Sequence, residues 1–184
     1  MEDKFDKKLY EDYMNGNEES FKLLYNKYRN KVKYFIYNMV KDMEKAEDLT
    51  QETFLYIIQN KNILKYNFKY YIYLVAKSKT LNYIRVEKRR NEINQLYNLS
   101  YQESDQDDIL EKIINKECQK ELLQAIQELE IKYRNALYLV CIEGISYNDT
   151  AQIIGETLSN TKNLVHRGKI KLRGIFLKKG FNKM

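Results

Sequence analysis

Residues that can bind nucleic acid recur at helical spacing near the C-terminal end of the chain. At about 100° per residue, one side of segment 158–172 carries Lys162, Asn163, His166, Arg167 and Ile170. Lysine and arginine can bind guanine acceptors and phosphates, and asparagine can pair with an adenine edge. The opposite side carries Leu158, Thr161, Val165, Gly168 and Leu172. The pattern predicts a helix that buries this second side and presents the first to the major groove of DNA.

A short helix and a tight turn are expected to hold this helix in place. Ser146, with Asp149 three residues later, is typical of a capped helix start, and we predict a helix to Ile154. Gly155 permits a tight turn, and Thr157 can cap the helix that follows. Together these residues predict a helix-turn-helix.

Helical spacing of apolar residues continues through most of the 184 residues, which include no proline and only six glycines. Asn17 is a candidate cap for a helix with apolar residues from Phe21 to Met39. Further helices are predicted over 42–59, 68–90 and 132–143, the last ending at Gly144, and one or two helices over 109–126. The sequence therefore predicts an all-α protein with two small helical domains, 1–92 and 109–184, joined by a flexible acidic linker, 93–108.

The charge of the chain, +6 overall, is concentrated in blocks. Residues 61–90 hold nine Lys or Arg against one acid, with six aromatic residues interleaved. Residues 162–184 hold eight Lys or Arg and no acid, whereas 103–121 hold seven acids and three lysines. A single basic block is often only a solvated surface. Two blocks, one rich in aromatic rings that can stack on bases, favour binding to nucleic acid.

The helix predicted over 42–59 has a different exposed face. Its core side is expected to carry Ala46, Leu49, Thr50, Thr53, Phe54 and Ile57. Its other side carries Glu44, Asp48, Gln51 and Glu52, with Leu55 among them. This arrangement fits either an acidic solvated face with one stray leucine or a docking surface with an apolar anchor. Because the face is acidic, any partner there is expected to be a protein rather than DNA.

Little in the sequence predicts catalysis, a metal or a cofactor. The two cysteines, Cys118 and Cys141, lack a metal-binding spacing, and Cys141 is expected to be a buried thiol in an apolar segment. The one histidine, His166, has no candidate co-ligand near it in sequence. We predict no catalytic residue, no metal site, no cofactor and no small-molecule substrate.

The N-terminal residues 1–13 are dense in charge and show no apolar core segment, so we expect no signal peptide. No apolar run approaches the roughly 20 residues that a membrane-spanning helix needs. We expect a cytoplasmic protein.

Three blocks of the sequence resemble a known family. They are AEDLTQETF (46–54), YIYLVAKSKTLNYIRVEKRR (71–90) and YRNALYLVCIEGISYNDTAQIIGETLSNTKNLVHRGKIKLR (133–173). In this order they are similar to the extracytoplasmic-function (ECF) group of bacterial RNA polymerase sigma factors, which belong to the sigma-70 family. The resemblance implies an alternative sigma factor that binds core polymerase, recognises the −35 and −10 promoter elements and promotes DNA melting.

The resemblance also implies roles for individual residues. Contacts to core polymerase, through its β′ and β subunits, are expected at Asp48, Leu49, Gln51, Glu52 and Leu55. Contacts to the −10 element are expected at Lys65, Tyr66, Phe68, Tyr71, Lys77, Ser78, Asn82 and Arg85. Contacts to the −35 element are expected at Asn160, Lys162, Asn163, His166 and Arg167. The family further implies an anti-sigma factor as a partner, often one anchored in a membrane.

The sequence departs from the family pattern at several positions. Tyr71 replaces the usual tryptophan, and Ser78 replaces a common asparagine. In the predicted recognition helix, Leu164 replaces a frequent arginine, so a phosphate contact is expected to be lost there. Gly168 replaces a frequent alanine, which is expected to weaken helix propensity by roughly 1 kcal/mol.

Two other classes of protein compete with the sigma factor interpretation. A dimeric helix-turn-helix regulator would need a dimer face or a sensor pocket, for which the N-terminal half offers no pattern. A nuclease or recombinase could use metal-binding acids, for which Glu103, Asp105, Asp107 and Asp108 are candidates. These acids lie in the predicted linker without a scaffold, so a solvated run of charge is the simpler interpretation.

Overall fold

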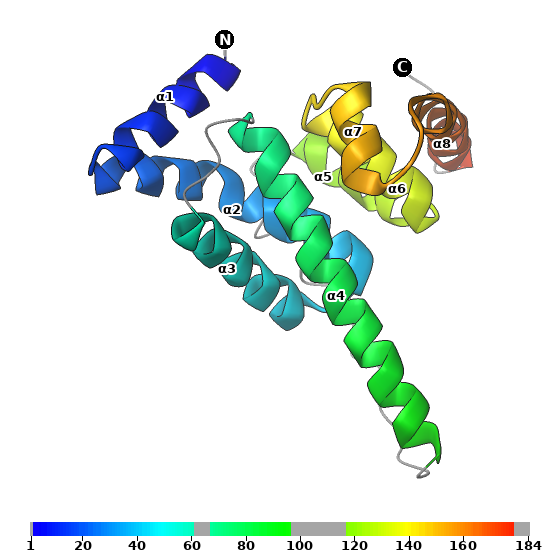
Figure 1. The fold of residues 1–184 in the computed structure, drawn as a ribbon. Helices are drawn as coiled ribbons and strands as arrows, with labels where there is room; N and C mark the ends of the chain where they lie inside the picture. The colour runs from blue at the N-terminus through cyan, green and yellow to red at the C-terminus, as the bar shows by residue number, and fades with distance from the viewer. Residues whose placement is uncertain (1, 61–66, 97–116, 179–184) are drawn as a thin grey trace. The chain divides into compact units, whose positions relative to one another are not determined.

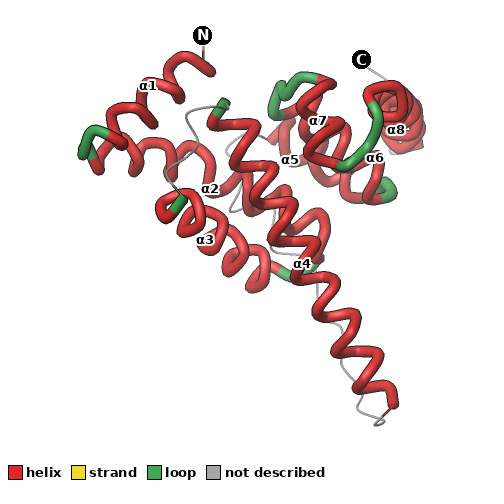
Figure 2. The backbone as a smooth tube through the Cα atoms, in the orientation of Figure 1, coloured by secondary structure: helices red, strands yellow, loops and turns green. Residues whose placement is uncertain are grey.

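The computed structural model describes residues 2–60, 67–96 and 117–178. Every regular element among these residues is a helix and none is a strand (Figures 1 and 2). The chain divides into two compact units, Met1–Ile109 and Leu110–Met184. The predicted all-α class with two helical units is thus confirmed.

The described residues of the first unit form four helices: α1 (Glu2–Met14), α2 (Glu18–Val40), α3 (Met43–Gln59) and α4 (Phe68–Leu96). The predicted cap of α2 is confirmed, because Asn17 Oδ1 accepts a hydrogen bond from the backbone N–H of Ser20 at 3.3 Å. Asp42 caps α3 in the same way, accepting from the Lys45 N–H at 3.0 Å. Between these helices Lys41 adopts a left-handed conformation with φ of 59°, which turns the chain within two residues.

Helix α1 packs against α2 and α4 of the first unit. Leu9 and Tyr10 are buried, and the Tyr10 ring lies 5.6 Å from the ring of Phe68 at the start of α4. The Asp6 carboxylate is also fully buried, where it forms an ion pair of 2.6 Å with Lys27 and accepts a hydrogen bond from the Tyr28 hydroxyl. Burial raises the pKa of Tyr10 to about 12. Helix α1 is therefore part of the first core.

Helix α4 is longer than predicted. It runs for 29 residues and ends at Leu96, whereas the sequence predicted an end near Arg90. Residues 93–96, placed at the start of the predicted linker, are helical. The rest of that linker, with its candidate metal-binding acids, lies outside the described residues.

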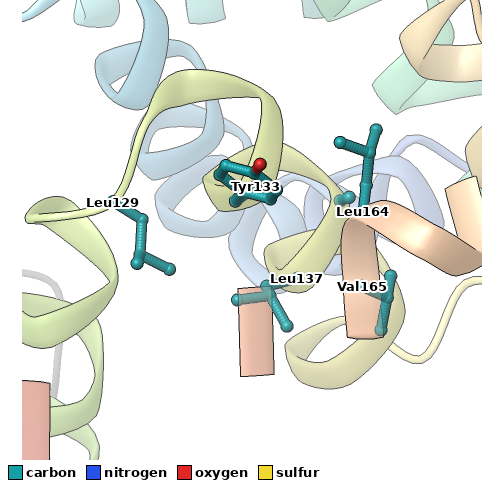
Figure 3. Close-up of a cluster of buried hydrophobic side chains, with 6 residues drawn as sticks. Leu129, Tyr133, Leu137, Leu164 and Val165 are labelled. Carbon is teal, nitrogen blue, oxygen red and sulfur yellow. The ribbon is translucent and has the colours of Figure 1, made fainter. Parts of the chain in front are cut away.

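The second unit contains α5 (Glu117–Gln127), α6 (Ile131–Leu137), the π-helical turn η2 (Tyr138–Ile142), α7 (Tyr147–Ile154) and α8 (Leu158–Lys178). Side chains of α6 and α8 meet in its core (Figure 3). The members of this cluster are Leu129, Tyr133, Ala136, Leu137, Leu164 and Val165. Arg134 is buried beside them and donates to the carbonyls of Gln127 and Leu129 at 2.8 and 2.7 Å, which satisfies the C-terminal end of α5.

The helix predicted over 132–143 is present, but its second half is the π-helical turn η2. The wider turn places Glu143 inside, where its carboxylate accepts a hydrogen bond from the Tyr138 hydroxyl at 3.2 Å. Cys141 is exposed, so the prediction of a buried thiol was wrong. Partial desolvation nevertheless raises the pKa of this thiol above its ordinary value. Helical spacing alone did not reveal the extra residue in the turn.

Candidate nucleic-acid and protein interfaces

The predicted helix-turn-helix is confirmed in its local geometry. Ser146 Oγ accepts from the Asp149 N–H at 3.1 Å and lies 2.8 Å from the Asp149 carboxylate, to which it can donate. Gly155 adopts a left-handed conformation with φ of 77°, which ends α7. The Asn160 N–H donates to Thr157 Oγ1 at 3.1 Å, so Thr157 caps α8 as expected.

The rotation of α8 agrees with the sequence prediction at most positions. Thr161, Val165 and Gly168 are buried. Exposed side chains on the other side include every residue expected at the −35 element: Asn160, Lys162, Asn163, His166 and Arg167. No hydrogen bond or ion pair engages the side chains of Lys162, Asn163, His166 or Arg167 within the described parts of the chain. The face therefore combines cations and an amide that have no partner among the described residues.

Two leucines of α8 lie elsewhere than expected. Leu158 was assigned to the inner side but is 39% exposed, because it is the first residue of α8 and lies before the part of the helix that packs in the core. Leu164 was treated as a lost phosphate contact but is 7% exposed and belongs to the cluster around Leu137. The buried stripe of α8 is thus wider than the projection suggested.

Gly168 has a packing role that helix propensity does not predict. A Cβ atom at this position would lie 2.8 Å from Leu137 Cδ1 and 3.0 Å from Leu137 Cγ. These distances are shorter than van der Waals contact, so the missing side chain lets α8 approach α6 closely. The glycine that we expected to weaken the helix also sets the position of that helix on its own unit.

The exposed face of α3 has the composition that the sequence predicted. Asp48, Gln51 and Glu52 are exposed, and Leu55 among them is 53% exposed. The face carries its own counter-charges. Lys45 Nζ lies 3.4 Å from Asp48, a hydrogen bond that raises the pKa of Lys45, and Lys79 of α4 lies 3.4 Å from Glu52. The result is an apolar side chain surrounded by partly neutralised polar groups.

Leu49 is the exception among the residues expected at this face. It is 4% exposed and packs in the core, because it follows the buried Ala46 by one turn. It does line a groove of about 600 Å³ between α3 and α4, together with Glu52 and Tyr56. Its expected contact with core polymerase stays a prediction.

Tyr56 and Lys79 are among the groove residues that were not picked out from the sequence as candidates. Tyr56 is 38% exposed, and the ammonium of Lys79 lies 5.4 Å from the centre of its ring. The Tyr56 position was open to prediction, since it follows Glu52 by four residues and shares that side of α3. The place of Lys79 in the groove could not be predicted, because its proximity to α3 depends on how α4 packs.

Comparison with known proteins identifies both units. Residues 24–90 match the family model described as Sigma-70 region 2, and residues 119–172 match that described as Sigma-70, region 4. The chain is 27% identical over 161 residues to the ECF RNA polymerase sigma factor SigX of Bacillus subtilis, spanning 85% of this chain and 83% of that protein. It is 26% identical over 176 residues to SigW of the same organism, spanning 91% and 94%. The chain belongs to the ECF group of the sigma-70 family.

Solved structures support the fold of this sigma factor. CnrH, in complex with the cytosolic domain of CnrY, superposes with a TM-score of 0.60 at 14% identity, over 94% of this chain and 97% of that one. The sigma factor RpoE of Bartonella quintana, in complex with the anti-sigma factor NepR, gives 0.61 at 20% identity, over 85% and 96%. At these identities the likeness concerns the fold alone.

The residues expected at the −10 element fall into several environments. Tyr71, Ser78 and Asn82 line the groove between α3 and α4 and so share one surface of the sigma factor. Phe68 is 2% exposed and packs between the rings of Tyr10 and Tyr28. The first turn of α4 directs this side chain into the core, and its expected contact with DNA stays a prediction.

The other expected −10 residues lie apart from the groove or outside the described residues. Lys77 Nζ lies 3.6 Å from the sulfur of Met39 on α2, and burial lowers the pKa of this lysine. Arg85 is exposed further along α4. Lys65 and Tyr66 lie outside the described residues.

Residues 2–60, 67–96 and 117–178 show neither a metal site nor a membrane span. Within them, no group of three or more His, Cys, Asp or Glu side chains is arranged to hold a metal ion. None of the described helices combines the length and apolar character needed to span a bilayer.

Proposed function

We propose that this chain acts as an alternative sigma factor: it binds core RNA polymerase, recognises the −35 and −10 promoter elements and promotes opening of the DNA. The observation that carries the proposal is the exposed face of α8, where two cations, an imidazole and an amide have no partner within the described residues. The region 2 and region 4 matches lie on the units that contain the two candidate surfaces. The chain itself is assigned no catalytic step.

The first unit is proposed to dock on core polymerase through α3. Leu55 is half exposed at the centre of a polar ring, which is the arrangement of an apolar anchor in a protein interface. Asp48, Gln51 and Glu52 are proposed to surround the contact and fix its orientation. The groove beside them, lined by Tyr71, Ser78 and Asn82, is proposed to meet the −10 region. Aromatic rings there offer faces on which unpaired bases can stack.

The second unit is proposed to read the −35 element through α8. Recognition helices of helix-turn-helix proteins place their N-terminal residues against base edges in the major groove. Asn160, Lys162 and Asn163 lie in the first turns of α8 and are exposed. His166 and Arg167 follow on the same side and are proposed to contact bases or phosphates.

An inhibitory partner is also proposed. The solved relatives were determined with protein partners, CnrH with the cytosolic domain of CnrY and RpoE with the anti-sigma factor NepR. We infer that an anti-sigma factor regulates this chain as well. The half-exposed Leu55 and the adjoining groove provide an apolar surface for it. Action on polymerase and promoter DNA implies work in the cytoplasm.

The test is in vitro transcription with purified core polymerase on genomic fragments, with start sites mapped. We expect starts that depend on the chain and share two sequence elements upstream. Size-exclusion chromatography with core polymerase should show co-elution. A chain that forms a dimer, does not bind core polymerase and stimulates no transcription would instead be a helix-turn-helix regulator.

A further inference from the structure

An exposed hydrogen bond links the turn of the helix-turn-helix to the first turn of α8. Asn160 Nδ2 lies 2.6 Å from Glu156 Oε2. Both residues are exposed, and Glu156 precedes the capping residue Thr157. This bond is therefore on the same end of α8 that helix-turn-helix proteins place against base edges.

The backbones of both residues are fixed by other hydrogen bonds. The Glu156 N–H donates to the carbonyl of Ala151 at 2.9 Å, across the turn that Gly155 makes. The Asn160 N–H donates to Thr157 Oγ1 at 3.1 Å. Because both backbones are held, the bond between the two side chains needs little additional ordering.

The chemistry of the bond determines which way the Asn160 amide points. An ionised carboxylate only accepts hydrogen bonds, so the NH₂ group of the amide must face Glu156. The carbonyl oxygen of Asn160 is then directed away from Glu156 as an acceptor. In the major groove, acceptors are recognised by the amino groups of adenine and cytosine, whereas guanine and thymine present acceptors at the equivalent positions.

We propose that Glu156 is a positioning residue that sets the base preference of Asn160. The inference rests on the proposed function, since it assumes that α8 reads the −35 element. By holding the NH₂ group, Glu156 makes Asn160 favour adenine or cytosine over guanine or thymine on the strand that it contacts. The charge of Glu156 has a second effect, because a carboxylate at this end of α8 repels DNA phosphates.

A structural role for Glu156 is the competing explanation, because an acid near the N-terminus of a helix stabilises that helix. The two roles differ in what they change. Loss of helix stability would weaken binding at every position of the −35 element. Loss of positioning would change the base preference at one position and leave the others as they were.

The experiment uses the full chain bound to core polymerase and a promoter library with a randomised −35 element. The wild-type chain should select adenine or cytosine at one position, on the order of tenfold over guanine or thymine. Glu156→Ala should lower this ratio to below about threefold at that position alone, while total binding to DNA rises. Glu156→Gln should also lower the ratio, because the glutamine amide can either accept from the Asn160 NH₂ group or donate to the Asn160 carbonyl oxygen and so no longer fixes the orientation of Asn160.

Three further variants complete the design. Asn160→Ala should abolish the base preference. Glu156→Ala combined with Asn160→Ala should show the same base preference as Asn160→Ala alone. Glu128→Ala removes an exposed acid from the turn after α5 and should leave all preferences unchanged.

The inference is overturned if Glu156→Ala keeps the wild-type preference, or if it changes all −35 positions equally. A wild-type chain that selects no −35 sequence at all overturns the proposed function, and the inference with it.

Discussion

Helices α3 and α8 each bury one side and expose a charged one, but the two exposed faces differ in how their charges are paired. On α3, the Asp48 carboxylate lies 3.4 Å from Lys45 of the same helix. The Glu52 carboxylate lies 3.4 Å from Lys79 of α4. On α8, neither Lys162 nor Arg167 has an ion pair within the described residues. Lys171, one turn after Arg167 on α8, is paired with Glu130 at 3.3 Å.

The difference indicates two ways of preparing a surface for a partner. Unpaired cations on α8 can neutralise phosphates without first breaking an internal contact, and they release counterions when they do so. The acids on α3 are already partly neutralised, so their net attraction for a basic partner is small. The affinity of the α3 face is then expected to depend on Leu55 and on shape.

The largest effect on stability is expected from placing a charge on the buried side of α8. Val165 is 1% exposed, so Val165→Asp places an unpaired charge in the core around Leu137 and should cost more than about 3 kcal/mol. Hydrogen exchange on the full chain should show lost protection in α6, α7 and α8 while α1 to α3 keep theirs. If Val165→Asp is tolerated, α8 is rotated from the orientation described.

The two faces should differ in how strongly salt weakens the binding of their partners. Promoter affinity of the complex with core polymerase should fall on the order of 10³-fold between 50 and 200 mM salt, for six or more phosphate contacts. Affinity of the chain for core polymerase should fall less than about tenfold over the same range, because the acids on α3 are already paired. Fluorescence anisotropy with labelled DNA and with labelled chain measures both. Equal slopes would remove the contrast between the faces.

Changing the α3 face should remove polymerase binding without unfolding the chain. Leu55→Asp combined with Gln51→Ala should weaken binding at least about 30-fold, the loss expected for a central apolar anchor. Both side chains are exposed, so circular dichroism should be unchanged. Leu23→Asp on α2 is a matched control, because Leu23 and Leu55 are both 53% exposed. Equal binding by the two variants would show that the docking face lies elsewhere.

The smallest effects are expected from single contacts on α8. Asn163→Ala and Arg167→Ala should each cost roughly 1–3 kcal/mol at the −35 element and relax the base preference there. Neither should destabilise the second unit, since both side chains are exposed. Transcription from promoters with scanned −35 bases measures the effect. Lys171→Ala serves as the control, because this lysine is paired with Glu130 and should not affect base preference.

Features set by neighbouring residues could be predicted from the sequence. The caps at Asn17, Ser146 and Thr157 each join a side chain to a backbone N–H three residues later, a relation that a sequence displays directly. The buried stripe of α3 was predicted for the same reason, as it repeats at helical spacing. The region 2 and region 4 families were likewise identifiable from contiguous motifs.

Features that depend on distant residues could not be predicted. Asp6 is charged and near the N-terminus, so nothing local indicates that Lys27 and Tyr28 bury it. Phe68 looked like an aromatic residue for stacking on bases, but packing against α1 and α2 buries it. The groove between α3 and α4 exists only once both helices have packed.

The close approach at Gly168 has a consequence for engineering promoter choice. A recognition helix transplanted from a relative with alanine at this position would bring a methyl group into the space of Leu137, a buried residue with little room to move. Residues 137 and 168 should therefore be exchanged together, although they lie on different helices. A chimera that transfers α8 should also transfer the matching residue of α6, so that the new helix sits at the depth for which its side chains were selected.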